Sequence, residues 1–466
     1  MKKLLGSAGL CLCLAISACG GSGGGKKDEA SPGVFDPFPS TYAAYPSETT
    51  LITGATVLDG KGALIENGRV LIQDGKIAAI GADITAPEGA ATIDAAGKWV
   101  TPGIIDNHSH LGAYPSPGVE AHSDGNEISA PVTAEVWVEH SVWPQDPGFT
   151  RALAGGITSL QILPGSANLF GGRGVVLKNV PARSVQEMKF PGAPHTLKMA
   201  CGENPKRVYG YGRGFPGGAP FSRMGNVAGY RTAWIEARDY KKKWDDFAAN
   251  GGTEPARNLE LETLAGALSG DILVHMHCYR ADEMAIILDL SEEFGYKVAS
   301  FHHAVEAYKI ADKLEEYGTC SSMWADWWGF KMEAYDGIRE NIPMVHNAGA
   351  CAIVHSDSDI GIQRLNQEAA KAWADGKRAG IDIPIEVAWE WLSLNPAKSL
   401  GIDSKTGSLE PGKMADVVIW SANPFSVYAK AEKVFIDGAL MYDLNDPAYQ
   451  PVMDFELGQP GEGDHK

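Results

Sequence analysis

The stretch that decides the fold is residues 100–112, which read VTPGIIDNHSHLG. Its apolar part, 103–105, predicts a short buried strand that leads into two histidines one residue apart. Because alternate residues of a strand point to the same face, His108 and His110 project together from the carboxyl end of this strand. Two neutral imidazoles held in this way are typical of one half of a metal site, although a single His-x-His also occurs as packed or surface residues.

The bulk composition is that of a folded chain with an acidic balance. At 466 residues the chain can bury a barrel and a smaller domain, and 44% of its residues are hydrophobic. The formal net charge of -18 argues against nucleic acid or anionic lipid as the main partner. We expect a small-molecule substrate, no nucleic acid, and no membrane contact except through a lipid anchor; a homo-oligomer stays open.

The first residues predict an export signal. A basic start, Met1-Lys2-Lys3, precedes an apolar run over 4–16 that is too short to span a membrane stably. The ending Ile16-Ser17-Ala18-Cys19 resembles the lipobox of bacterial lipoproteins, which implies cleavage before Cys19 and lipidation of its thiol. A plain signal peptide with an incidental cysteine is the alternative.

The segment after this signal reads as a tether. Residues 1–19 are expected to be the lipoprotein signal peptide, and the Gly-, Pro- and Ser-rich residues 20–49 a flexible linker. Gly20 after the cysteine resembles lipoproteins sorted to the outer membrane. We therefore expect a periplasmic protein tethered to that membrane.

The cysteines of the mature chain predict no disulfide framework. They are widely spaced and each lies in an apolar context, at Cys201, Cys278, Cys320 and Cys351. We expect buried free thiols in core strands.

Two β-rich segments flank a long middle. Residues 50–100 and 404–445 alternate short apolar strands with turn signals such as Asp59-Gly60. They predict one small β-sandwich built from both ends of the chain, with a barrel domain over 101–403 inserted between them and a tail over 446–466.

The middle alternates strand-like and helical runs. The helical runs include 231–248, 281–294 and 306–317, and the strand-like runs are 159–163, 174–177, 197–201, 272–277, 297–303 and 352–355. Repeated βα units of this length predict an α/β fold, a parallel (β/α)8 TIM barrel whose active site lies at the carboxyl ends of the strands.

Further candidate ligands fall at such strand ends. Either Lys198, as a carboxylated lysine, or Glu203 could bridge two metal ions. Lys198 could bridge the ions if its side chain faces the barrel interior. Facing the helices instead, it would be a buried unpaired charge, which is costly. Glu203 could bridge the ions if Gly202 ends the strand and lets it turn in.

Paired histidines and an aspartate follow on the later strands. His277 lies nearer the strand end than His275 and is the preferred ligand, and His303 is preferred to the adjacent His302. Asp357 lies at the end of the last strand. Together with His108 and His110, these side chains have the ligand chemistry of two borderline divalent ions.

The chain resembles the amidohydrolase superfamily through two motifs that bracket nearly the whole mature chain. They are TPGIIDxHxH over 101–110 and GSLxPGxxAD over 407–416. Between them, KMAxGENPK over 198–206 and HxxRADE over 277–283 are similar to the imidazolonepropionase-like branch. The resemblance implies a divalent metal site, most often two zinc ions with manganese, iron or cobalt as alternatives, held by His108, His110, His277, His303 and Asp357, with Lys198 or Glu203 bridging.

The activity implied is that of a metal-dependent amidohydrolase. A metal-activated hydroxide would cleave the C–N bond of an amide, peptide-like or N-acyl amino acid substrate, with Asp357 passing the proton to the leaving nitrogen. Lactone or ester hydrolysis and deamination are alternatives on the same site. A surface-tethered binding lipoprotein without catalysis is the alternative of another class.

Substrate contacts are weakly marked in the sequence. Arg173 and Arg280 could clamp a substrate carboxylate. Trp324, Trp327 and Trp328 either wall an apolar subsite or pack their own loop.

Overall fold

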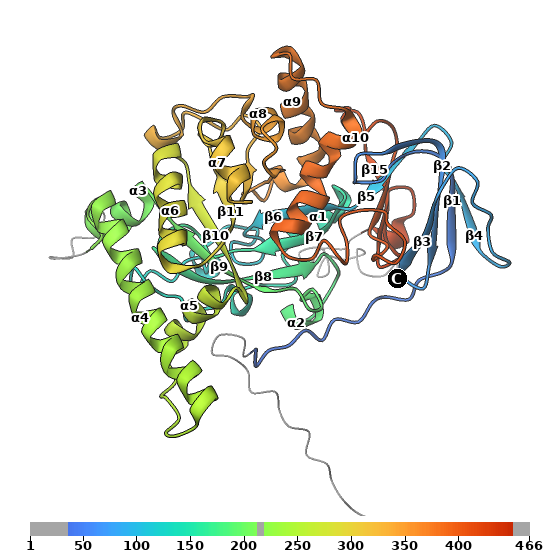
Figure 1. Cartoon of the computed structure of the whole chain (residues 1–466). Coiled ribbons are helices and arrows are strands. Elements are labelled where there is room, and N and C mark those ends of the chain that lie inside the picture. The colour runs from blue at the N-terminus through green and yellow to red at the C-terminus, as the bar shows by residue number, and fades with distance from the viewer. Residues whose placement is uncertain (1–35, 212–218, 451–466) are drawn as a thin grey trace, which may run out of the picture.

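The computed structural model describes residues 36–211 and 219–450, which form two eight-stranded sheets and the helices around them (Figure 1). The barrel sheet is formed by β6 (Ile104–Ser109), β7 (Ile157–Ile162), β8 (Phe170–Lys178), β9 (His195–Ala200), β10 (Ile272–Cys278), β11 (Val298–His303), β12 (Cys320–Met323) and β13 (Ala352–Val354). The second sheet is formed by β1 (Thr50–Leu58), β2 (Leu64–Gln73), β3 (Lys76–Gly81), β4 (Ala91–Asp94), β5 (Trp99–Pro102), β14 (Val417–Trp420), β15 (Ala431–Ile436) and β16 (Ala439–Asp443).

Strand β8 runs antiparallel to both of its neighbours, which corrects the expected all-parallel barrel. It pairs antiparallel with β7 and β9, whereas β6 with β7, and β9 through β13, pair in parallel. The connection over 163–169 is too short for the crossover of about a dozen residues that a parallel pair needs. The chain therefore turns back as a hairpin, and the other barrel strands keep their carboxyl ends at one end of the barrel.

The barrel is nearly closed by contacts that follow β13. The backbone amide of Ser356 donates to Asp106 Oδ1 at 3.2 Å, and that of Asp357 donates to the His108 carbonyl at 3.0 Å. The TIM-barrel-like fold is therefore confirmed, with one reversed strand.

The segments from the two ends of the chain meet in one mixed sheet, in place of the expected β-sandwich. Strands are ordered β16-β15-β14-β5-β1-β2-β3, and β4 also pairs with β1. The sheet is mixed because β1 is antiparallel to β2 but parallel to β4 and β5. Strand β5 also pairs with β14, so hydrogen bonds connect the amino-terminal strands to the carboxyl-terminal ones. Its own core includes Ile52, Val70, Val417, Ile419 and Phe435.

Contact with the Thr158 side chain explains the glycine that leads into β6. A Cβ on Gly103 would lie 2.1 Å from Thr158 Oγ1 on β7, so a larger residue would separate the first two barrel strands.

Helices cover the outside of the barrel (Figure 1). The predicted helix over 281–294 is α6 (Ala281–Phe294), and the one over 231–248 is the middle of the longer α4 (Arg223–Asn250). In the run 306–317, the α-helix α7 is shorter than predicted, Ala311–Glu316. The others are α1 (Pro147–Ala154), α2 (Val185–Met188), α3 (Glu203–Pro205), α5 (Leu259–Ser269), α8 (Asn341–Asn347), α9 (Leu365–Arg378), α10 (Ile385–Ala388) and α11 (Leu394–Ser399).

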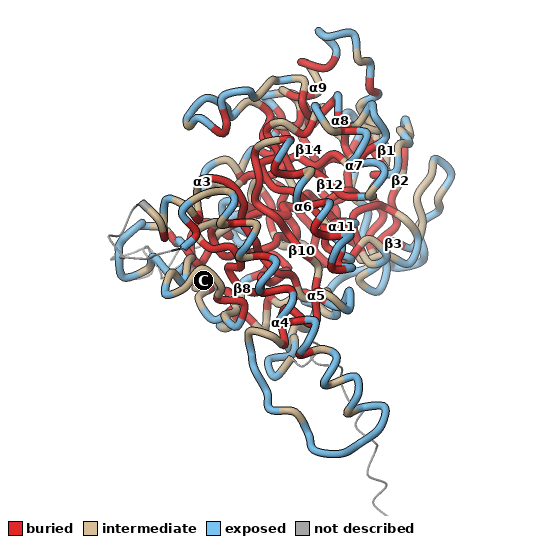
Figure 2. Tube along the Cα trace, turned by 60° about the vertical axis from the view of Figure 1, so that its left-hand side comes forward, coloured by how far each residue is buried: buried red, intermediate tan, exposed pale blue. Residues whose placement is uncertain are grey.

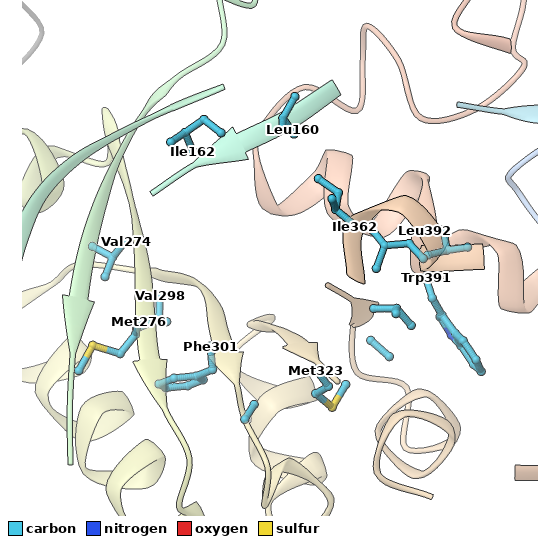
Figure 3. Packing of buried hydrophobic residues seen from close by; sticks show 14 of the residues in the cluster. Leu160, Ile162, Val274, Met276, Val298, Phe301, Met323, Ile362, Trp391 and Leu392 are labelled. Carbon is cyan, nitrogen blue, oxygen red and sulfur yellow. The ribbon is translucent and has the colours of Figure 1, made fainter. Parts of the chain in front are cut away.

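The hydrophobic core lies between the barrel strands and these helices. Figure 3 shows Met276 on β10 and Phe301 on β11 in this cluster, and both are fully buried. Because strand side chains alternate, the neighbours of these apolar residues point into the barrel. Figure 2 shows that buried residues fill the centre around β10 and β12, whereas the projecting end of α4 is exposed. The apolar positions thus fix which polar residues face the barrel interior.

Two disulfides contradict the expectation of free thiols. Cys201 bonds Cys278 and Cys320 bonds Cys351, with Cα atoms 5.2 and 4.4 Å apart. Each pair joins neighbouring strand ends, at β9 and β10 and at β12 and β13. Sequence separations of 77 and 31 residues concealed this proximity.

The described part of the predicted linker is attached to the rest of the molecule. The Tyr45 hydroxyl donates to the Pro181 carbonyl at 2.7 Å, and the Tyr42 hydroxyl to Asp437 Oδ2 at 2.5 Å. The signal peptide, Cys19 and most of the tail lie outside the described residues. Among the described residues, no helix is both long and apolar enough to cross a membrane.

Candidate metal and active site

Histidines converge at the carboxyl ends of the barrel strands. This histidine cluster comprises His108, His110, His275, His277, His302, His303 and His355. All are buried except His110, whose side chain is 19% exposed. The strand alternation that turns Met276 and Phe301 outward turns the flanking His275, His277 and His302 inward.

The backbone at the end of β11 brings a second histidine inward. His303 would face the helices if the strand continued regularly after His302. Its φ of +70° is in the left-handed region, which non-glycine residues seldom occupy and which is frequent at functional sites. Both members of the pair therefore belong to the cluster. His303 Nδ1 lies 3.1 Å from His355 Nε2, whereas His302 lies deeper, with its ring nitrogens 2.8 Å from His108 Nδ1 and from His275 Nδ1.

Asp357 lies beside the outer histidines. Its Oδ1 is 3.1 Å from His110 Nε2 and 3.4 Å from His108 Nε2, and its Oδ2 is 3.7 Å from His303 Nδ1. Burial raises the pKa of Asp357, but the hydrogen bond from His110 and the neighbouring positive charges outweigh burial and lower it. The carboxylate is therefore charged, as a ligand or a proton acceptor must be.

Lys198 faces the barrel interior. It is fully buried, pairs in register with His275, and its Nζ donates to the Pro164 carbonyl at 3.1 Å. Burial lowers the pKa of Lys198 to about 8. The structure thus brings Lys198 together with the histidine cluster.

Glu203, the other bridging candidate, lies at the rim of the barrel. Its side chain is 31% exposed, and its Oε1 is 3.7 Å from Lys331 Nζ. Its backbone amide donates to Glu333 Oε1 at 2.7 Å. These contacts place Glu203 in a separate charged group above the cluster.

The cluster fits a metal centre. Buried imidazole nitrogens of His108, His275, His277 and His355 have no hydrogen-bond partner among the described residues. Two groups, His108 with His302 and His355, and His108 with His303 and Asp357, each have ligand atoms within 4.8 Å of one another. Unpartnered buried nitrogens are costly unless something binds them, and this donor set is the one that divalent transition metals prefer.

An aromatic cavity of about 480 Å³ opens beside Asp357. We use this name for the space lined by Tyr279, Trp324, Asp326, Trp327, Trp328, Phe330 and Asp357. The rings of Trp324 and Tyr279 both stack on His303, at centroid distances of 4.3 and 5.3 Å. The cavity wall therefore continues directly into the site.

A second cavity, of about 370 Å³, lies near His110 and His277, and we call it the polar cavity. It is lined by Tyr114, Ser123, Asn126, Ile128, Ser166, Ala167, Asn204, Arg207 and Val208. Tyr114 packs its ring 5.7 Å from that of His110. Asn204 Nδ2 lies 3.3 Å from His277 Nε2. The two cavities thus reach the histidine cluster through different residues.

The two arginines expected to bind substrate lie away from the cluster. Arg173 on β8 is buried, donates from Nε to Thr263 Oγ1 on α5 at 2.8 Å, and lies 4.2 Å from the Trp137 ring. Arg280 forms a partly exposed ion pair with Asp282. Neither lines the aromatic or the polar cavity.

Sequence reasoning missed several residues that adjoin the site. The sequence patterns indicated no role for His355, Tyr279 or Lys331. The Nζ of Lys331 lies 4.0 Å from the Tyr279 ring centre and 3.1 Å from Asn204 Oδ1. Tyr279 lies two residues after His277, and His355 two residues after Ile353. The period of two residues in a strand could therefore have predicted that both side chains face the barrel interior. Lys331 comes from a long loop, where no periodicity indicates direction.

Comparisons with known proteins agree on one family. Residues 99–441 match the model of the amidohydrolase family. A crystal structure of an amidohydrolase from Thermotoga maritima is 34% identical, covers 84% of this chain and 100% of that one, and has a TM-score of 0.77.

Two curated relatives match this chain less completely than that amidohydrolase does, one in the share of its length that is covered and the other in sequence identity. The protein named Amidohydrolase tasK of Hapsidospora irregularis is 32% identical over 379 residues, which cover 77% of this chain but 38% of that protein. The chain thus spans well under half of that relative. The imidazolonepropionase of Mesorhizobium japonicum is 24% identical over 358 residues, 72% of this chain and 80% of that one.

Proposed function

We propose, from the premise that this chain belongs to the amidohydrolase family and is a hydrolase, that it uses bound divalent metal to cleave the C–N bond of an amide, peptide-like or N-acyl amino acid substrate. One observation carries the proposal. Two potential ligand groups share His108 and include unpartnered imidazole nitrogens, and one of them contains the charged Asp357.

The side chains that would hold metal are His108, His110, His277, His303, Asp357 and Lys198, the last as a carboxylated lysine. Lys198 is preferred to Glu203 because it is buried among the histidines, whereas Glu203 pairs with Lys331 at the rim. A lysine must be neutral to take up carbon dioxide, and the lowered pKa of Lys198 favours that form. Two zinc ions suit imidazole and carboxylate ligands, with manganese, iron or cobalt as alternatives.

Divalent ions bound here would lower the pKa of a water and polarise the scissile carbonyl. The chain's own residues supply the rest. Asp357 accepts the proton of the attacking water and returns it to the leaving nitrogen. The rings of Trp324 and Tyr279, which both stack on His303, hold that imidazole in one orientation.

The first test is elemental analysis of the purified chain lacking residues 1–19. About two metal ions per chain, lost in the double variant His108→Ala/His110→Ala, is the result expected. A hydrolysis panel of dipeptides, N-acyl amino acids, lactones, esters and aminopurines then separates C–N hydrolysis from the alternative reactions. A chain that binds no metal after incubation with zinc or manganese contradicts the proposal and favours a binding protein.

We also propose that the mature chain works in the periplasm, anchored to the outer membrane through Cys19. The two disulfides support an oxidising compartment, since such bonds are rare in the cytosol. Radiolabelled palmitate incorporation that disappears in Cys19→Ala, together with cell fractionation, tests the anchor. A cytosolic, unlabelled chain contradicts it.

A further inference from the structure

We propose that the aromatic cavity binds an aromatic or large aliphatic side chain of the substrate, next to the scissile bond. This inference rests on the proposed hydrolase function and names the substrate class for it. Trp327 and Phe330 are the residues through which the enzyme selects that side chain.

The position of the cavity argues that its occupant lies near the reacting atoms. Asp357 forms part of the cavity wall, and its carboxylate is 3.1 Å from His110 Nε2. Trp324 lies between the cavity and His303, on whose ring it stacks. A group that fills the cavity therefore belongs to the substrate rather than to a remote ligand.

The wall leaves large apolar surfaces in contact with water. Trp327, Trp328 and Phe330 are 40%, 50% and 58% exposed, and all three line the same cavity. Contiguous exposed aromatic surface of this kind marks a binding site, because covering it with an apolar group is favourable.

The rings are already arranged to receive a flat or branched apolar group. Trp324 and Trp327 stack at 5.4 Å with an interplanar angle of 24°, and Phe330 meets Trp324 edge-on at 5.8 Å. Rings held by one another lose little freedom when a ligand binds, so more of the contact energy appears as affinity.

Charge in the wall favours a neutral occupant. Asp326 is paired with Lys371 at 2.8 Å, and Asp357 faces the histidines. An acidic side chain would meet both carboxylates and be repelled. A basic side chain is the competing occupant, because aromatic rings also attract cations, and the test includes it.

The polar cavity does not compete for the apolar group. Its lining includes Asn126, Asn204 and Arg207, side chains that an apolar group would leave without solvent or partners. The substrate's polar remainder is better accommodated there, which leaves the aromatic cavity for the apolar part.

Kinetics of the metal-loaded full mature chain test the selection. Matched dipeptides carry Phe, Leu, Lys, Asp or Gly on either side of the peptide bond. We expect kcat/KM for the preferred orientation to be about tenfold or more higher with Phe than with Gly, the scale on which apolar pockets discriminate. Equal values, or a preference for Lys or Asp, overturn the proposal.

Variants locate the effect. Trp327→Ala and Phe330→Ala should each reduce the Phe-to-Gly selectivity ratio by about tenfold. Tyr428→Ala is the matched control, since Tyr428 is an aromatic residue that is 86% exposed and does not line the cavity, and its ratio should stay that of the parent chain. An unchanged ratio in both cavity variants overturns the assignment.

A binding measurement separates this inference from the hydrolase proposal. Calorimetry on metal-free protein compares N-acetyl-phenylalanine amide with N-acetyl-glycine amide. Tighter binding of the first by about tenfold, lost in Trp327→Ala, supports the cavity assignment even if the metal-loaded chain hydrolyses no peptide. Equal binding of the two amides, alongside measurable hydrolysis, overturns the cavity assignment and leaves the hydrolase proposal standing.

Discussion

The backbone amide of Asp357 donates a hydrogen bond to the carbonyl oxygen of His108, with a nitrogen-to-oxygen distance of 3.0 Å. His108 belongs to β6 and Asp357 follows β13, so this bond joins the two edges of the barrel sheet. It also sets the Asp357 carboxylate beside His108 and His110. The hydrogen bond that closes the barrel therefore also positions Asp357 in the site.

Asp357→Asn should keep most of the bound metal but lose most of the turnover. Asparagine retains the shape and the backbone hydrogen bond to His108, but it cannot accept a proton from water. General-base catalysis is typically worth about 10²–10⁴-fold, and kcat should fall by that order. Elemental analysis and steady-state kinetics on the same sample check this. A metal-replete variant with the parent rate would rule out the proposed role of Asp357.

Lys198→Met should lose bound metal, whereas Glu203→Gln should keep it. Lys198 is the buried candidate and Glu203 is the partly exposed one, so the pair forms a matched comparison. In the parent chain, ¹³C-labelled bicarbonate should yield a carbamate signal by NMR that is absent from Lys198→Met. The reverse pattern of metal loss would assign the bridge to Glu203.

Removing the disulfide Cys201–Cys278 should destabilise the chain. In the loop-entropy model, closing a loop of 77 residues contributes about 4.5 kcal/mol to the free energy of unfolding. Denaturant titration of Cys201→Ala/Cys278→Ala against the parent measures this. Thiol titration of the denatured, unreduced chain lacking residues 1–19 should detect no free thiol, because its four cysteines are paired; reactive thiols would restore the free-thiol interpretation.

Lys178→Met should disrupt the junction between the barrel and the second sheet. Lys178 Nζ lies 3.0 Å from both Asp416 Oδ1 and Asp437 Oδ1, and all three side chains are buried. Leaving two buried carboxylates without their cation should lower the free energy of unfolding by about 3–5 kcal/mol.

Lys61→Met serves as the control for the junction variant, because it removes an exposed ion pair with Glu410 and should change little. Denaturant titrations of both variants give the comparison. If both variants lost a similar amount of unfolding free energy, the buried ion pairs of Lys178 would contribute no more to stability than the exposed pair of Lys61 does.

Local sequence patterns predicted the elements of the barrel well and their pairing less well. Alternation of apolar residues located β10, which carries His277, and β13, which Asp357 follows, because period two is a property of the strand itself. The reversal of β8 was not predicted, because the spacing of the strand-like runs resembles that of a βα repeat. The observed connection over 163–169 is too short for a parallel crossover. The orientation of Arg173 was not readable, since its partner Thr263 lies on α5, far along the chain.

What the sequence by itself determined is most of the barrel strands, several of their inward-facing histidines and the family to which the motifs at 101–110 and 407–416 belong. Only the tertiary structure decided that His302 and His303 both enter the site, that Lys198 rather than Glu203 is buried among the histidines, and that Cys201 meets Cys278. The reason is physical: side-chain alternation is set by neighbouring residues, whereas a left-handed turn at a strand end, an inward lysine and a disulfide each depend on contacts between segments that only the closed barrel brings together.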